Sequence, residues 1–190
     1  MALPSTRMEF KITLCDSERG IDLATNLILG RHPSETLEHA VLRVLGWCLL
    51  HDGKDGLELG PGLSDAEGAD LLSRDGTGRA TVWVECGATS WDKVKRVLSQ
   101  NGGVAVHGVF AGPKRKNDLL AQIADLPRPP KDLGAVVLWT IDPALVASLA
   151  KKDDRRQRWT VTAMEGHLYV EADGVSFDGE VIRTGAGDPG

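Results

Sequence analysis

The alternation of apolar and polar positions predicts strands at both ends of the chain. Apolar and polar residues alternate from Met8 to Leu14, which is the period-two signature of a half-buried strand. A polar turn follows, and Ile21 to Leu29 can return as an antiparallel partner. Near the other end, Trp159 to Met164 and His167 to Val170 can pair around a Glu-Gly turn. We therefore expect a hairpin at each end.

A spacing of three to four residues between apolar positions marks His32 to Leu50 as the clearest helix. Pro33 suits the first helical position, and Glu35 places a negative charge in the first turn, where the helix dipole favours it. The apolar residues form one buried face. Glu35 and His39 lie on a different face and are neighbours there, because they are four residues apart. The plainest interpretation of this pair is helix capping and a solvated charge.

Between the hairpins, helices alternate with short apolar strands. We expect strands at 57–59, 70–72, 79–86, 104–110 and 135–140, and helices at 91–100, 116–125 and after Asp142-Pro143. On the strand that ends at Cys86, Trp83 and Glu85 share one face, because strand side chains alternate. This order predicts an α/β (α+β) fold, with a mixed central β-sheet flanked by helices and hairpins at both ends.

Composition indicates one globular domain over residues 1–183 and a disordered tail over 184–190. The chain has 190 residues, of which 42% are apolar and 26% charged, typical of a single folded domain. The N-terminus lacks a signal-peptide pattern, and no apolar run is long enough to span a bilayer. Three cysteines without paired spacing suit reduced thiols. We therefore expect a cytoplasmic protein that does not bind membranes.

The net charge of −5 argues against general affinity for nucleic acid, so attraction to phosphate needs a local basic patch. Two runs qualify, Lys114–Lys116 and Lys151–Arg158. Such runs are more often solvated loop ends than binding sites.

Common catalytic motifs are missing from the sequence, which leaves carboxylate chemistry. There is no G-x-S-x-G elbow, phosphate-binding loop or H-E-x-x-H motif. Cys86 has no histidine placed by spacing, so a buried structural thiol is the favoured interpretation. Glu35, Asp70 and Glu85 lie on three different predicted elements, and carboxylate oxygens of this kind suit Mg²⁺ or Mn²⁺.

Several short stretches resemble the YaeQ family of bacterial proteins. They are Arg31–Thr36 (RHPSET), Glu38, Arg43, Gly62–Ser64, Asp70-Leu71, Thr77-Gly78 and Trp83–Gly87. The resemblance covers nearly the whole chain and is densest from Arg31 to Lys95. The family resembles the PD-(D/E)XK nuclease fold, a restriction-endonuclease-like core of a helix, three strands, a helix and a strand. Residues 32–110 supply that order.

The resemblance implies a variant nuclease site. Asp70 and Glu85 would bind Mg²⁺ (or Mn²⁺), and Glu35 would bind the ion or orient water. The chain departs from the family where Ala69 replaces the usual proline before Asp70. The motif lysine is also missing, because Gly87 stands in its place, and Lys93 is the best substitute. The predicted catalytic set is therefore Glu35, Asp70, Glu85 and Lys93.

Two functions follow from these residues. The first is a metal-dependent nuclease that hydrolyses phosphodiester bonds. The second is a catalytically inactive module of the same fold that binds nucleic acid or a protein partner, which the missing lysine and the acidic net charge favour. Fold alone does not decide between them.

Overall fold

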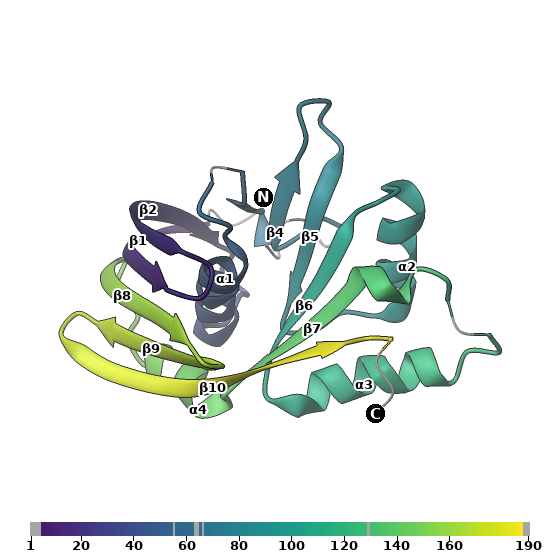
Figure 1. The fold of residues 1–190 in the computed structure, drawn as a ribbon. Helices are drawn as coiled ribbons and strands as arrows, with labels where there is room; N and C mark the ends of the chain where they lie inside the picture. The colour runs from purple at the N-terminus through teal and green to yellow at the C-terminus, as the bar shows by residue number, and fades with distance from the viewer. Residues whose placement is uncertain (1–4, 55, 63–64, 66, 129, 188–190) are drawn as a thin grey trace.

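A computed structural model describes residues 5–187, except 55, 63–64, 66 and 129. In this part of the chain, ten strands form one mixed sheet and four α-helices pack on it (Figure 1). The strands are β1 (Thr6–Asp16), β2 (Ile21–Arg31), β3 (Glu58–Leu59), β4 (Leu71–Arg74), β5 (Ala80–Cys86), β6 (Ala105–Ala111), β7 (Val136–Ile141), β8 (Arg156–Met164), β9 (His167–Ala172) and β10 (Val175–Gly185). The helices are α1 (Leu37–Leu50), α2 (Trp91–Gln100), α3 (Pro113–Ala124) and α4 (Pro143–Leu149). The predicted mixed α/β architecture is confirmed.

The strand order is β2-β1-β8-β9-β10-β7-β6-β5-β4-β3. The predicted hairpins β1–β2 and β8–β9 are both present and antiparallel. β1 also pairs in parallel with β8, which joins the two ends of the chain. The strands β5, β6 and β7 are parallel, and β4 pairs antiparallel with β5. The long strand β10 links the two parts of the sheet, because it pairs with β9 and then with β7.

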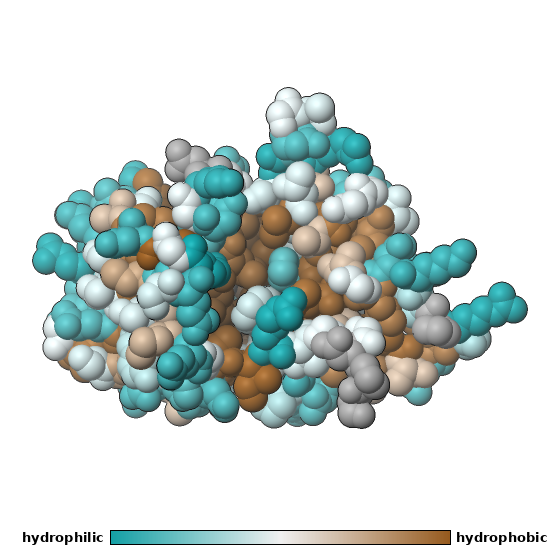
Figure 2. All heavy atoms as spheres, in the orientation of Figure 1, coloured by the Kyte–Doolittle hydropathy of each residue, from teal (hydrophilic) through white to brown (hydrophobic). Residues whose placement is uncertain are grey.

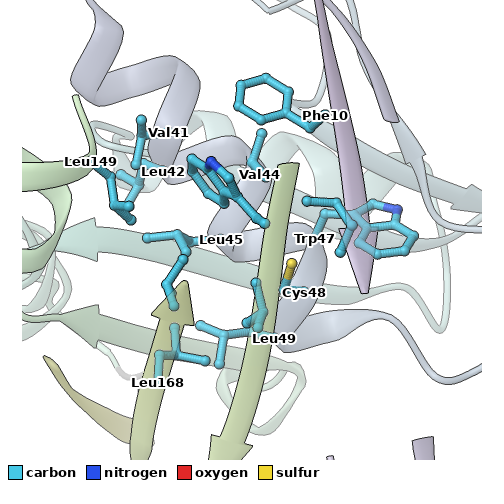
Figure 3. Packing of buried hydrophobic residues seen from close by; sticks show 14 of the residues in the cluster. Phe10, Val41, Leu42, Val44, Leu45, Trp47, Cys48, Leu49, Leu149 and Leu168 are labelled. Carbon is cyan, nitrogen blue, oxygen red and sulfur yellow. The ribbon is translucent and has the colours of Figure 1, made fainter. Parts of the chain in front are cut away.

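The sheet curves around α1 until its edge strands β2 and β3 contact each other (Figure 1). Ala40 to Leu49 of α1 are all buried. The predicted single buried face is therefore wrong, because α1 contacts both parts of the sheet and α4. Figure 3 shows α1 side chains packed towards Phe10 of β1, Leu149 of α4 and Leu168 of β9.

The helix α1 begins at Leu37 rather than at His32. Thr36 is its N-cap, and its hydroxyl accepts a hydrogen bond from the His39 N–H at 3.2 Å. The preceding residues form a turn in which the Glu35 N–H donates to the His32 carbonyl at 2.8 Å. Glu35 therefore lies just before the helix, and Pro33 belongs to the turn.

The helices α2 and α3 cover the other face of β5, β6 and β7 and enclose a second core. The buried residues Val94 and Val97 of α2 and Leu119 of α3 belong to this core, together with Phe110 of β6. In the same orientation as Figure 1, Figure 2 shows hydrophobic residues mainly between the two parts of the molecule and hydrophilic side chains projecting outwards.

The C-terminal strand β10 was not predicted. It runs to Gly185, and the Ala186 N–H donates to the Val136 carbonyl at 3.0 Å. The end of β10 therefore overlaps the predicted tail (184–190) at Thr184 and Gly185, while 188–190 lie outside the described residues. The cysteines are free thiols, with Cys48 and Cys86 buried. No helix in the described ranges is long and apolar enough to cross a membrane.

Candidate functional site

Asp70 is held at the start of β4 by hydrogen bonds to the end of β5. Its N–H donates to the Val84 carbonyl at 2.9 Å, and its Oδ2 accepts from the Cys86 N–H at 2.8 Å. Burial raises the pKa of Asp70, but His39, the Cys86 N–H and Arg43 outweigh it and leave this pKa below its usual value. Asp70 is therefore a fixed, ionised carboxylate.

Glu85 lies on the face of β5 that α2 covers, and it shares that face with Trp83 as predicted. Its Oε1 accepts from the Trp83 Nε1–H at 2.6 Å, and its Oε2 accepts from Lys93 Nζ at 2.8 Å. Burial raises the pKa of Glu85, and Lys93 and Trp83 offset this only in part. Glu85 is therefore the most easily protonated of the three predicted carboxylates.

The first turn of α2 brings Lys93 to Glu85. Ser90 is the N-cap, and its Oγ accepts from the Lys93 N–H at 3.3 Å. The Lys93 ammonium also donates to the Gly68 carbonyl at 3.0 Å. Lys93, which we predicted as the substitute for the missing motif lysine, therefore lies beside Glu85.

Glu35 is surrounded by donors. Its side chain has no exposed surface, and its Oε1 accepts from His39 Nδ1 at 2.7 Å and from Arg43 Nη1 at 3.2 Å. Its Oε2 accepts from the His32 N–H at 3.2 Å. Burial raises the pKa of Glu35, but His39 and Arg43 lower it further, so the carboxyl is ionised. The interpretation of Glu35 and His39 as a solvated pair is wrong.

His39 connects Glu35 to Asp70. Its Nδ1 faces the Glu35 carboxylate, while its Nε2 lies 3.2 Å from the Cys86 carbonyl and 3.5 Å from Asp70 Oδ1. These partners can only accept hydrogen bonds, so both ring nitrogens must carry protons. Burial lowers the pKa of His39, but Asp70 and Glu35 raise it to about 9. His39 is therefore a cation at neutral pH.

Arg43 is completely buried and contacts the same two carboxylates. Its Nε lies 3.5 Å from Asp70 Oδ1, and its guanidinium also donates to the Gly60 carbonyl. Gly62 packs directly on it, because a Cβ there would lie 2.5 Å from Nη1 at a left-handed φ of +58°. Gly62, the first residue of the Gly62–Ser64 stretch in the family resemblance, therefore covers Arg43, and Leu63 and Ser64 lie outside the described residues.

A cavity of about 270 Å³ opens at this site, and its lining includes His39, Asp70, Glu85 and Lys93. Glu35 is not in the lining and reaches the cavity only through its partners. Within the described part of the chain, no three His, Cys, Asp or Glu side chains are grouped to hold a metal ion. The structure thus brings Asp70, Glu85 and Lys93 together and sets Glu35 behind them.

Sequence reasoning missed His39 and Arg43 as site residues. A partial signal was present, because Glu35, His39 and Arg43 follow one another at intervals of four, the spacing of neighbours on a helix surface, although the structure places Glu35 just before α1. Together with Lys93, these two cations match the three carboxylates one for one. These six groups together are therefore electrically neutral without any bound ion, while the exposed carboxylate of Asp65 also contributes to the cavity lining.

Comparisons with known proteins agree over nearly the whole chain. The family model described as YaeQ protein matches residues 1–181. The uncharacterized protein YaeQ of Salmonella typhi is 27% identical over 178 residues, 90% of each chain. Its counterpart in Escherichia coli K12 is 28% identical over 176 residues, 91% of this chain and 92% of that one.

Two crystal structures share the fold. The YaeQ protein from Xanthomonas axonopodis pv. citri superposes with a TM-score of 0.82 at 23% identity and covers 94% of this chain and 97% of its own. The YaeQ protein from Pseudomonas syringae has a TM-score of 0.79 at 24% identity, with 95% and 96% coverage.

Proposed function

The chain belongs to the YaeQ family, and from this premise we propose that its cavity hydrolyses phosphodiester bonds as a variant PD-(D/E)XK nuclease. The observation that carries the proposal is the position of Lys93, whose Nζ lies 2.8 Å from Glu85 in a cavity that Asp70 also lines. The order α1, β3, β4, β5, α2, β6 supports it, because that is the order of a helix, three strands, a helix and a strand.

Asp70 and Glu85 have the donor atoms that a divalent cation needs. Among the described residues, the polar contacts of Asp70 Oδ1 are the 3.5 Å contacts with His39 and Arg43, so this oxygen keeps coordination capacity on the cavity side. Mg²⁺ is usually held by one or two carboxylates, with water and substrate phosphate completing its shell. Asp70 and Glu85 would hold the ion, and Glu35 would not. When bound, the ion would acidify a water and neutralise phosphate charge.

Lys93 and His39 supply the cavity with positive charge from the chain itself. An ammonium has three N–H donors, and Lys93 uses two of them on Glu85 and the Gly68 carbonyl. The third can donate to a phosphate oxygen and stabilise the charge that develops there. Arg43 and Glu35 act as positioning residues, since they fix His39 and Asp70 from behind.

Because the three carboxylates and three cations of this cluster balance, the binding of a divalent cation should depend on the binding of substrate. A divalent cation alone would give the buried cluster a net charge of +2, whereas a cation with a phosphate diester leaves a smaller excess. Ion and substrate should therefore strengthen each other's binding. We expect weak Mg²⁺ binding by calorimetry, and tighter binding when a non-cleavable phosphorothioate oligonucleotide is present.

The experiment is a cleavage assay on single- and double-stranded DNA and RNA with Mg²⁺ or Mn²⁺. Asp70→Asn, Glu85→Gln and Lys93→Met should each abolish cleavage, whereas Asp118→Asn, on an exposed α3 position, should not. Thermal unfolding of every variant shows that it folds. Activity that survives Asp70→Asn or Glu85→Gln would contradict the assignment.

Of the two basic runs, Lys114–Lys116 is the better candidate for contact with nucleic acid. In the described part of the chain its side chains make no ion pair. In the second run, Lys152 pairs with Asp173 and Asp154, which lowers the local positive charge. Charge reversal of Lys114 and Lys116 should weaken oligonucleotide binding and reduce its dependence on salt.

The second candidate function is an inactive module that binds nucleic acid or a protein partner. The pairing of each carboxylate with a protein cation favours it, because the folded site needs no ion for charge balance. The calorimetric titration separates the two functions. Absence of Mg²⁺ binding in the presence of oligonucleotide, together with absence of cleavage, would favour the inactive module.

A further inference from the structure

A second, larger hollow lies on the opposite side of α2 from the cavity. This groove has a volume of about 550 Å³, and its lining residues come from α2 and from the connector that follows α3. Both elements can be followed in Figure 1. Its floor includes Trp91 and Leu98 from α2 and Leu126 from the connector. Lys93 faces the cavity, whereas Lys95, two residues further on, faces the groove. The groove is thus separate from the proposed catalytic site.

Cations predominate at the rim of this groove. Lys95, Arg128 and Lys131 contribute to its lining, and among the described lining residues Asp132 is the single acidic one. All three cations are exposed, and within the described residues they make no ion pair or side-chain hydrogen bond. Such a concentration of free positive charge stands out in a chain whose net charge is −5.

Trp91 adds an unused hydrogen-bond donor. Its side chain lines the groove and is only 5% exposed. The indole N–H makes no hydrogen bond within the described part of the chain, and it is not among the buried donors that lack a partner, so it is accessible to solvent and can donate to a ligand. The Trp91 backbone is fixed, because its N–H donates to Gln122 of α3 at 3.0 Å. The groove therefore combines an apolar floor, a free donor and a cationic rim.

We infer that this groove binds a short acidic peptide segment of a partner protein. Carboxylates of the segment would pair with Lys95, Arg128 and Lys131, and an apolar side chain would lie on Leu98 and Leu126. The volume suits a few side chains rather than a folded domain. A peptide fits better than nucleic acid because the floor is largely aliphatic, whereas bases stack on exposed aromatic faces. The inference does not depend on phosphodiesterase activity.

The test is selection of peptides from a random display library on the immobilised full chain. The matched pair of variants is K95E/R128E/K131E, in the groove, and R7E/K11E/K54E, which reverses three exposed cations elsewhere. Circular dichroism and thermal unfolding show that both variants fold. We expect enriched peptides to carry acidic residues next to a Leu, Phe or Trp. They should bind the groove variant about tenfold or more weakly and the control variant as the unchanged chain, with affinity falling as salt rises.

Four outcomes would overturn the inference. The first is enrichment of basic or uncharged peptides, and the second is an equal loss of binding in both variants. The third is a library that yields no specific peptide from repeated selections. Displacement of selected peptides by an oligonucleotide at lower concentration would also count against it and would assign the groove to nucleic acid.

Discussion

Replacement of Arg43 by methionine should be among the most damaging single substitutions in this protein. Arg43 is completely buried and lies 3.2 Å from Glu35 Oε1 and 3.5 Å from Asp70 Oδ1. Methionine fills similar volume but leaves Glu35 with one cationic partner and the Gly60 carbonyl without its donor. Removal of one partner from a buried ion pair typically costs about 3–5 kcal/mol. We expect a loss of unfolding free energy in that range.

The same loss can be expressed as a melting temperature. The entropy of unfolding scales to about 0.4 kcal/mol/K for 190 residues, so Arg43→Met should lower the melting temperature by about 8–13 °C. Urea unfolding with an unchanged slope would assign the loss to the folded state. Arg43→Lys, which retains one charge, should lose less.

Arg96→Met is the matched control, because Arg96 and its partner Glu67 are 42% and 71% exposed. An exposed pair of this kind contributes about 0–1 kcal/mol. A loss below about 1 kcal/mol in Arg43→Met, or equal losses in the two variants, would refute the view that Arg43 neutralises the buried carboxylates.

Three further predictions, one of them with a control substitution, test single features of the fold. The pKa of His39 is raised to about 9 from 6.5. Protonation of His39 therefore contributes about 3 kcal/mol to the free energy of unfolding, and this contribution is present below pH 6.5 and lost as pH rises through 9. In urea unfolding between pH 6 and pH 10, His39→Gln should therefore lose less stability than the unchanged chain, and parallel pH profiles would argue against a charged His39. Gly179→Ala should cost about 1–3 kcal/mol, since a Cβ there would lie 2.9 Å from the Leu145 Cβ. Gly134→Ala, which meets open space, should be neutral in the same thermal scans. Thr36→Ala removes the N-cap of α1 and should lower the free energy of unfolding by about 1 kcal/mol, measured by urea titration. An unchanged free energy of unfolding would show that the cap does not stabilise the fold.

Local patterns in the sequence predicted most elements, but competing signals misplaced some of them. Pro33 and Thr36 are both good starting residues for a helix, and the apolar spacing cannot choose between them. The hydrogen bond from Glu35 to His32 decides in favour of Thr36, because it forms a turn before the helix. The strand β10 was missed because Gly179 occupies a position where alternation calls for a large apolar residue. A tertiary contact explains why glycine is needed there, since α4 packs directly on Gly179 and leaves no room for a side chain.

The site was predictable where the residues lie on neighbouring elements. Lys93 follows Glu85 by eight residues, and a strand followed at once by a capped helix brings the two together. The role of Arg43 was not predictable from its spacing alone. A buried arginine needs known acceptors, and here one of them, the Gly60 carbonyl, comes from a connection without a clear pattern.

The parallel pairing of β1 with β8 has a consequence for how the chain folds as it is synthesised. Glu9 is in register with Arg156, and Asp16 with Ala163, so each contact closes a loop of roughly 147 residues, and such distant contacts slow folding. The hairpin β1–β2 is synthesised well before β8, so one edge of β1 stays unpaired until β8 is made. An open strand edge is a template for wrong pairing. The hairpin β1–β2 therefore precedes β8 in synthesis but gains its last neighbour only after β8 is made, and during that interval it needs protection from aggregation.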